Sequence, residues 1–353
     1  MNRVKLGDVA FERKETCKVG KEQYPIVGLE HLIPDQITLT EWSDDPKTTF
    51  TKFFHKGDVL FGRRRAYLRK AVIAPFDGIC SGDITVISAM GGKIAPELLP
   101  HIIQNEAFFD FAVGKSDGSL SPRVKWDKLE KYEFNLPSLD EQQKLAEILW
   151  SMVETKEAYS DLLQITDELV KSQFIEMFGE AKKYPLKELS EVAEIIAGGD
   201  KPIDNSDVKT DEYCFPVYAN GVENEGLQCY VKKYRVDREA VTISARGTIG
   251  ATFLRQPFFT PVVRLITVIP GRQIDATYLK YAIDYVRVSG NGSSQQQLTV
   301  PNVCKIRIPM PEIEQQKEYT TFVNQSGKSK YALQETIDAL NRTYKKIIAE
   351  NLG

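Results

Sequence analysis

The chain has 353 residues, of which 42% are hydrophobic, which is enough to bury more than one core, so two domains are expected. No run of about 18 uninterrupted apolar residues occurs, and charges interrupt the first fifteen residues, which argues against a membrane span and a secretory signal. The five cysteines lack C-x-x-C spacing and the three histidines stand apart, so we expect reduced thiols, no metal site and a cytoplasmic protein.

Charge is distributed unevenly along the chain. The formal net charge of −3 argues against indiscriminate binding to a polyanion. Residues 51–70 nevertheless carry seven basic side chains and one acidic one, a net charge of +6, whereas residues 140–178 carry nine acidic and three basic ones, a net charge of −6. The first segment could meet phosphate, and the second would repel it.

The chain repeats itself once. Four short matches recur in the same order with offsets of 183, 181, 182 and 173 residues. They join Leu6–Ala10 to Leu189–Ala193, Asp58–Leu60 with Arg65–Ala66 to Glu239–Val241 with Arg246–Gly247, Ile84–Ile87 to Ile266–Ile269, and Glu141–Lys144 to Glu314–Lys317. Because the offset drifts only by loop-sized insertions, the sequence predicts two diverged copies of one unit.

Each copy begins with about 135 residues that hold short β-rich runs bounded by Gly, Pro and Asp. The clearest runs are Ala71–Ala74, Ile84–Ile87 and Leu265–Ile269. Proline ends the last run of each copy, at Pro137 and Pro309. These patterns predict a compact mixed α/β domain with a twisted sheet in each copy.

A long helix is predicted after each domain, because the hydrophobic period changes from two to about 3.5. In the first copy the expected core positions are Leu145, Ile148, Met152, Thr155, Tyr159, Leu162, Thr166 and Leu169. Ser138 and Glu141 have the spacing of a capping box, and Gly179 stands where a glycine would end the helix. In the second copy the core positions are Tyr319, Phe322, Ser326, Ser329, Leu333, Leu340, Tyr344 and Ile347.

Neither apolar stripe can stay in water, and each could cover the other. We therefore expect an α+β protein with two similar domains, whose helices pair as an antiparallel coiled coil with pseudo-two-fold symmetry. The alternative is that each helix packs on its own domain. The expected boundaries are residues 1–137 and 181–311 for the domains, and 138–180 and 312–353 for the helices.

This organisation resembles the specificity subunit of type I restriction-modification systems. The resemblance rests on the Leu-x-x-Val-Ala start, the Arg-Gly-like turn, the Leu-Pro or Met-Pro before Glu-Gln-Gln, the helix ending in Phe178-Gly179-Glu180, and the repetition of the whole unit. The second copy departs from it by lacking a capping serine before Glu-Gln-Gln. The first departs by having Arg64-Arg65-Ala66-Tyr67 in place of the turn at Arg246-Gly247.

The resemblance implies a non-catalytic subunit that binds double-stranded DNA. Each domain would recognise one half of a bipartite, asymmetric site, and the helices would set the gap between the halves. Two adenine-N6 methyltransferase subunits would be partners, and the resemblance leaves open whether restriction motor-nuclease subunits join them. No glycine-rich cofactor fingerprint or Asn-Pro-Pro-aromatic signature is visible, so no cofactor is expected. A related restriction system and a coiled-coil scaffold are the alternatives.

The candidate DNA-binding residues fall in four segments. Consecutive arginines on a strand would point to both of its faces, and guanidinium groups bind phosphate or guanine. The polar segments before the final strand of each domain, and the Arg-Gly turn, could reach bases or phosphate, although mobile loops or a structural turn would look the same. The candidates are Arg63, Arg64, Arg65, Arg69 and Lys70, then Lys115, Ser119, Arg123 and Lys125, then Arg246 and Thr248, and finally Ser294, Gln295, Gln296 and Gln297.

Overall fold

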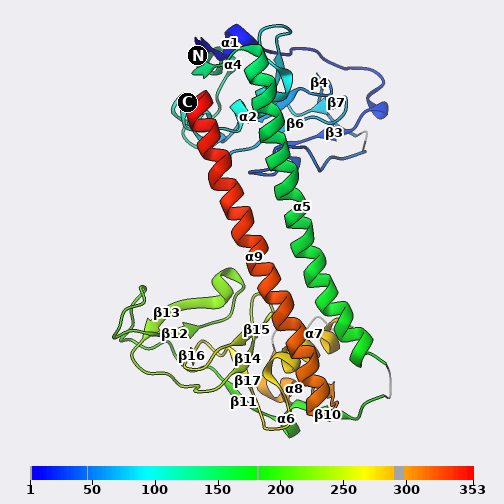
Figure 1. Cartoon of the computed structure of the whole chain (residues 1–353), viewed down its shortest axis with the longest axis vertical. Helices are drawn as coiled ribbons and strands as arrows, with labels where there is room; N and C mark the ends of the chain where they lie inside the picture. Colours follow the sequence, from blue (N-terminus) through cyan, green and yellow to red (C-terminus); the bar gives the residue numbers. More distant parts are fainter. Residues whose placement is uncertain (1, 46, 181–182, 290–297) are drawn as a thin grey trace. The chain divides into compact units, whose positions relative to one another are not determined.

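The computed structural model describes residues 2–45, 47–180, 183–289 and 298–353 (Figure 1). The chain divides into two compact units. Unit 1 holds residues 1–160 and 335–353, and unit 2 holds residues 161–334. None of the helices within the described ranges is long and apolar enough to cross a membrane.

Unit 1 contains three small sheets. A four-stranded sheet has the order β2-β8-β5-β6, with β2 at Ala10–Glu12, β8 at Ile84–Ala89, β5 at Val59–Gly62 and β6 at Ala71–Ile73. A three-stranded sheet has the order β3-β7-β4, with β3 at Ile26–Val27, β7 at Gly78–Cys80 and β4 at Lys52–Phe54. Strands β1 (Asn2–Lys5) and β9 (Glu133–Leu136) pair with each other. The short helices are α1 (Leu6–Val9), α2 (Leu99–Ile103), α3 (Glu106–Gly114) and α4 (Trp126–Leu129).

Unit 2 repeats this plan. Its four-stranded sheet has the order β11-β17-β14-β15, with β11 at Ala193–Ala197, β17 at Ile266–Pro270, β14 at Ala240–Ile243 and β15 at Thr252–Arg255. Its three-stranded sheet has the order β13-β12-β16, with β13 at Leu227–Val231, β12 at Phe215–Tyr218 and β16 at Thr260–Pro261. Strands β10 (Leu186–Glu188) and β18 (Arg307–Pro309) pair with each other. The short helices are α6 (Leu189–Val192), α7 (Ala276–Ser289) and α8 (Val300–Cys304).

The two units match strand by strand in their four-stranded sheets. The register confirms the equivalence, because Gly62 faces Ile84 in unit 1 as Ile243 faces Ile266 in unit 2. The mixed α/β class and the predicted β-rich runs are therefore confirmed. The units differ elsewhere, because a single helix of 14 residues, α7, covers the sheet in unit 2 where α2 and α3 lie in unit 1.

Helices α5 (Leu139–Phe178) and α9 (Ile313–Leu352) are each 40 residues long and unbroken (Figure 1). Leu149 from the start of α5 and Leu352 from the end of α9 lie in one core, in unit 1. Phe174 from the end of α5 and Tyr319 from the start of α9 lie in another core, in unit 2. The two helices therefore run antiparallel, as predicted.

Three of the eight predicted core positions of α5 are exposed. Ile148, Leu162 and Leu169 are 52%, 44% and 50% exposed, whereas Leu149 and Val170 are buried. Counted from Leu145, the covered positions of α5 follow one another in steps of four and then three residues. The predicted positions followed in steps of three and then four. Apolar residues occur at the positions of both patterns, so periodicity alone could not choose between them. In α9, Ser329 is exposed, and Ile337, which the prediction omitted, is buried.

A buried glutamine fixes the start of each long helix. The Gln142 amide donates to the Pro137 carbonyl at 2.9 Å, and its Oε1 accepts the Ala95 N–H at 2.8 Å. Gln316 donates to the Pro311 carbonyl at 2.9 Å and accepts the Asp275 N–H at 2.9 Å in the same way. The two helices are therefore equivalent at an offset of 174, one residue from the offset of the Glu-Gln-Gln match.

Ser138 and Glu141 pair at the start of α5 as their spacing predicted, and the glutamate half of a capping box forms. The Glu141 carboxylate accepts hydrogen bonds from both the backbone N–H and the hydroxyl of Ser138, at 2.9 and 2.8 Å. These bonds hold the pKa of Glu141 below its usual value. The carboxylate therefore stays charged at the N-terminus of the helix, where the helix dipole favours it.

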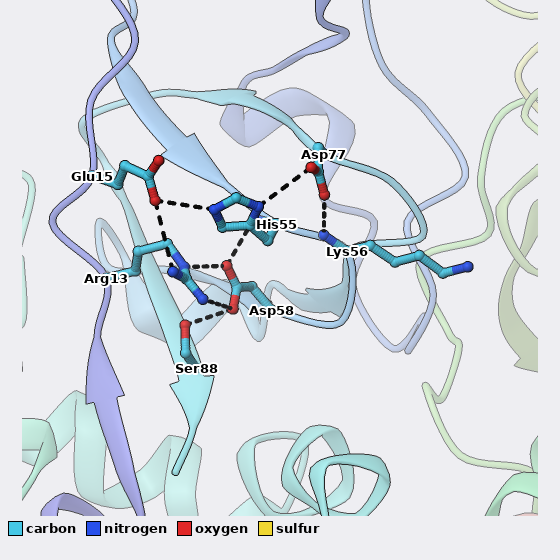
Figure 2. A network of polar contacts seen from close by, with 7 residues as sticks. All are labelled: Arg13, Glu15, His55, Lys56, Asp58, Asp77 and Ser88. Atoms are coloured by element: carbon cyan, nitrogen blue, oxygen red, sulfur yellow. Dashed lines mark hydrogen bonds and ion pairs between the residues drawn. The ribbon is translucent and has the colours of Figure 1, made fainter. Parts of the chain in front are cut away.

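A polar network joins the two larger sheets of unit 1 (Figure 2). Buried Asp58 accepts hydrogen bonds from Arg13 Nε at 2.7 Å, from Ser88 Oγ at 2.5 Å and from the His55 N–H at 2.8 Å. The His55 ring lies between Glu15 and Asp77, with contacts of 3.0 and 3.3 Å. Partial burial opposes protonation of His55, but the two carboxylates outweigh it and raise its pKa.

Unit 2 joins its sheets differently, through Arg255 of β15. This guanidinium is 2% exposed, lies 3.8 Å from the centre of the Tyr218 ring, and donates to Thr242 at 2.9 Å and to Glu225 at 3.0 Å. Burial lowers its pKa, and the surrounding groups only partly compensate. The link between the two larger sheets is therefore centred on the buried carboxylate of Asp58 in unit 1 and on the buried guanidinium of Arg255 in unit 2.

Candidate DNA interface

The predicted arginine cluster lies in a hairpin connection. Strand β5 ends at Gly62 and β6 begins at Ala71, so the cluster belongs to residues 63–70, which we call hairpin tip 1. The expectation that the arginines alternate between the faces of a strand is therefore wrong. A short 3₁₀ helix, η3 (Ala66–Leu68), folds the tip because the Leu68 and Arg69 N–H groups donate to Arg65 and Ala66 carbonyls.

Hairpin tip 1 holds two arginines in left-handed backbone conformations. Arg65 has φ of 55° and Arg69 has φ of 52°. This region costs an L-residue roughly 1–2 kcal/mol, so the surrounding structure must enforce it. The equivalent connection in unit 2, residues 244–251 or hairpin tip 2, meets the same need with Gly247 and Gly250, at φ of 71° and 86°. The two tips, whose sequences depart from each other, therefore share left-handed positions that are occupied by different residues.

The loop before the last strand of unit 1 is bound to hairpin tip 1. The Arg65 N–H donates to the Pro122 carbonyl at 2.7 Å, and the Val124 N–H donates to the Arg63 carbonyl at 3.0 Å. Arg123 itself is held by a pair of 2.9 Å backbone hydrogen bonds with Asp117. The structure therefore brings together Arg63, Arg64, Arg65 and Arg123, which the sequence placed in two separate segments.

Asp83 holds two of these arginines. The carboxylate accepts from Arg123 Nε at 2.8 Å and Nη2 at 3.4 Å, and from Arg64 Nη1 at 3.4 Å, while Arg64 Nε donates to Ser121 Oγ at 2.6 Å. The hydrogen bond from Arg123 holds the pKa of Asp83 below its usual value. The carboxylate therefore remains charged, and the two guanidinium groups are fixed.

A hollow of about 650 Å³ opens beside this cluster. Its lining includes Arg63, Asp83 and Arg123, with hydroxyl groups from Thr49, Thr51 and Ser81. The Arg63 Nε is buried and makes no hydrogen bond within the part of the chain that the structure describes. An unpaired buried donor is costly, so this atom favours a ligand with an acceptor.

The remaining candidate DNA-binding residues of unit 1 do not form a single cluster. Arg69 contacts Glu106 and Asp110 at 3.4 and 3.8 Å, and Lys70 Nζ donates to the Leu29 carbonyl at 2.7 Å. Lys115 lies 5.7 Å from the centre of the Phe111 ring. Its neighbours in the loop, Ser119 and Lys125, are exposed.

Unit 2 has a hollow of about 350 Å³ at the equivalent end of its four-stranded sheet. The lining includes Lys201, Arg246 and Arg264. Arg246 and Thr248 are exposed in hairpin tip 2, and Arg246 forms no ion pair with any residue that the structure describes. Asn220 joins the tip to the neighbouring loop, because it accepts the Ala245 N–H at 2.7 Å and donates to the Val263 carbonyl at 2.8 Å.

Val263 and Arg264 both have left-handed backbone conformations, with φ of 51° and 60°. For a β-branched residue such as valine this conformation is a marked outlier. Strained backbone therefore occurs next to the hollow of each unit. The last four candidates, Ser294, Gln295, Gln296 and Gln297, lie outside the described residues.

Comparison with known proteins identifies the family. The model of the type I restriction modification DNA specificity domain matches twice, over residues 1–164 and 181–342. The chain belongs to this family. The two matches confirm the duplication, and membership confirms the predicted role in DNA-sequence recognition within a type I restriction-modification system.

Two relatives are similar to this chain in sequence. A Mycoplasma pneumoniae protein that carries the name of a type I specificity subunit is 28% identical over 265 residues, which is 69% of this chain and 76% of that protein. The EcoDI specificity subunit of Escherichia coli is 28% identical over 144 residues, 38% of this chain and 30% of that protein.

Two solved structures share the fold. One is a chain from a structure of type I restriction-modification complex assembly, with a TM-score of 0.63, 19% identity, and coverage of 99% of this chain and 97% of that one. The other is the S subunit of M. genitalium, with a TM-score of 0.63, 12% identity, and coverage of 98% and 94%.

Sequence reasoning missed Asp83, Asn220, Lys201 and Arg264 in this DNA specificity chain. Asp83 immediately precedes β8, and Asn220 lies two residues after β12. Polar residues just outside strand ends that meet at one edge of a sheet were the available signal. In the described ranges, no three His, Cys, Asp or Glu residues come together to hold a metal ion.

Proposed function

We propose that the chain is a non-catalytic specificity subunit that directs partner enzymes to a bipartite, asymmetric DNA site. Unit 1 would bind one half-site, unit 2 the other, and α5 and α9 would set the gap. The observation that carries the proposal is the recurrence of one feature in both units: an exposed arginine, Arg65 or Arg246, on a left-handed hairpin tip beside a hollow. One protein with two such surfaces suits two half-sites.

The half-sites should differ because the two tips present different side chains. Tip 1 carries Tyr67 and Leu68, which are 54% and 41% exposed, between its arginines. Tip 2 carries Thr248 in the place of Tyr67 and Ile249 in the place of Leu68. Bulky apolar groups contact thymine methyl groups or unstacked base steps, whereas a hydroxyl can donate or accept a hydrogen bond. An asymmetric site follows from these differences.

Catalysis would come from two adenine-N6 methyltransferase subunits, joined for restriction by motor-nuclease subunits. The exposed face of α5 supports such a partner. Leu162, Ile165 and Leu169 lie on one side of the helix and are 44%, 56% and 50% exposed. Apolar residues in this spacing form a stripe of the kind that packs against another helix. The acidic character of the helix would keep this face off DNA.

Co-expression with the methyltransferase subunit encoded beside this chain tests the proposal. Methylated adenines are mapped across the host genome by sequencing. The proposal predicts a two-part motif with a constant gap, and it predicts that Arg65→Ala with Arg246→Ala abolishes methylation while the complex still assembles. A contiguous motif would mean that only one unit binds DNA, and no methylation from a folded complex would contradict the proposal.

A further inference from the structure

Asp83 contacts only one edge of the Arg123 guanidinium. The Asp83 carboxylate accepts hydrogen bonds from the Nε–H and from one Nη2–H of Arg123, at 2.8 and 3.4 Å. A guanidinium has five N–H donors, so the Nη1 group and the second Nη2–H are left on the opposite edge. That edge is a two-donor fork, and the side chain is 46% exposed.

The free edge of Arg123 has the geometry that guanine recognition requires. Guanine presents O6 and N7 as adjacent acceptors in the major groove, and a bidentate arginine is the common partner for this pair. A freely rotating arginine would lose rotamer entropy on binding. Arg123 would lose little rotamer entropy on binding, because Asp83 fixes its side chain and the paired hydrogen bonds with Asp117 fix its backbone.

We propose that Asp83 is a positioning residue that aims Arg123 at a guanine in the half-site bound by unit 1. This inference rests on the proposed function, because it requires that unit 1 binds DNA. Arg64 shares the same carboxylate and would support the adjacent phosphate or base. Asp83 itself touches no base, and it acts by restricting where Arg123 can point.

The charge of Asp83 argues against a site built only for affinity. A carboxylate beside the DNA backbone repels phosphate, so a surface meant to attract any DNA would be better without it. Its presence fits a side chain that lowers general affinity for DNA and raises selectivity. Unit 2 has Leu265 at the equivalent position, with 1% exposure, so the arrangement is confined to one half-site.

The test compares four proteins in complex with the methyltransferase subunit: the natural chain, Asp83→Asn, Arg123→Lys and a control, Glu133→Gln. The control removes one carboxylate from another ion pair of unit 1, between Arg3 and Glu133, at 3.2 Å. Binding is measured on duplexes in which each base pair of the methylated half-site is replaced in turn, and on DNA without the motif. Tryptophan fluorescence during urea unfolding checks that each variant folds.

The natural chain should discriminate against replacement of one guanine by roughly 5- to 150-fold, the range of a bidentate pair. Asp83→Asn should lose at least about five-fold of that discrimination, while binding to DNA without the motif stays the same or tightens. Arg123→Lys keeps the charge but lacks the fork, so it should lose preference at the same base pair. The control should resemble the natural chain.

Two results would overturn the inference. One is unchanged discrimination in Asp83→Asn. The other is uniform weakening by Arg123→Lys on all duplexes, which would mean that Arg123 binds phosphate. In either case the natural chain would still bind its two-part motif. If the natural chain itself bound no defined motif, the proposed function would fail instead, so the two failures are distinguishable.

Discussion

Acid should destabilise unit 1 through one buried histidine. His101 of α2 is fully buried, and its Nδ1 lies 2.7 Å from the Tyr344 hydroxyl of α9. Its ring also packs against Trp150 of α5, with centroids 4.8 Å apart. His101 therefore contacts both long helices within unit 1. Burial lowers its pKa to about 3.

The sign of the effect follows from proton binding. The unfolded chain binds a proton at this histidine below its ordinary pKa of 6.5, whereas the folded chain stays neutral until about pH 3. The contribution of His101 is therefore present above pH 6.5 and is lost as the pH falls from 6.5 toward 3. Each pH unit in this window costs about 1.4 kcal/mol, so a change from pH 7 to pH 5 should cost about 2 kcal/mol.

Urea unfolding followed by tryptophan fluorescence measures this effect in unit 1 alone, because all three tryptophans, Trp42, Trp126 and Trp150, lie there. The double variant His101→Leu with Tyr344→Phe removes the titration together with both hydrogen-bonding groups, which avoids leaving either one unpaired. Its unfolding free energy should fall by about 2 kcal/mol less than that of the natural chain between pH 7 and pH 5.

His55 provides a control of opposite sign. Its pKa is raised, so its contribution is present at low pH and is lost as the pH rises through the folded value. Replacing His55 with Gln should therefore make the loss of stability between pH 7 and pH 5 larger. If the natural chain and the His101→Leu/Tyr344→Phe variant lost the same stability over this range, the assignment of the acid sensitivity to His101 would be wrong.

Three further predictions concern the DNA surface, the start of α5 and its apolar face. Arg65→Ala and Arg246→Ala should each lower the slope of log K against log salt by about 0.9, because one fewer counterion is released, and a full slope in the double variant would contradict this. Gln142→Ala should cost unit 1 about 2 kcal/mol by leaving two buried backbone groups unpaired, whereas exposed Gln143→Ala should stay within about 0.5 kcal/mol; equal urea midpoints would refute it. Ile165→Asp should weaken capture of the methyltransferase subunit in a pull-down without changing the unfolding curve, and undiminished capture would exclude this face.

The duplicated architecture could be predicted from the sequence because equivalent strands of the two sheets have similar short apolar segments at a nearly constant offset. Short apolar runs such as Ile84–Ile87 and Ile266–Ile269 recur at one offset, and the structure places them on equivalent strands, β8 and β17. Periodicity also predicted both long helices. It misplaced Ile148 and Leu162, because apolar residues lie on both sides of α5 and only the partner helix determines which side is covered.

The interface could be predicted only in part, because side-chain contacts depend on the tertiary fold. The arginine cluster was visible as a run of charge, but its net charge of +6 does not describe an exposed surface. Lys52 is paired with Glu12 at 3.3 Å, and Lys70 with the Leu29 carbonyl. Asp83 lies 40 residues from Arg123, so no local pattern could join them. The Asp58 match to Glu239 was also misleading, because Asp58 is buried in a network and Glu239 is exposed.

The central claim is that two DNA-binding units act through a spacer of defined length. Inserting seven residues within Glu154–Thr166 and seven more within Leu333–Tyr344 keeps the 3.5-residue period and lengthens the helix pair by about 10 Å. The methylated motif of the co-expressed complex is then mapped by sequencing. The account predicts the same two half-sites separated by a gap that is about three base pairs longer. An active complex that methylates the original motif with its original gap would contradict it.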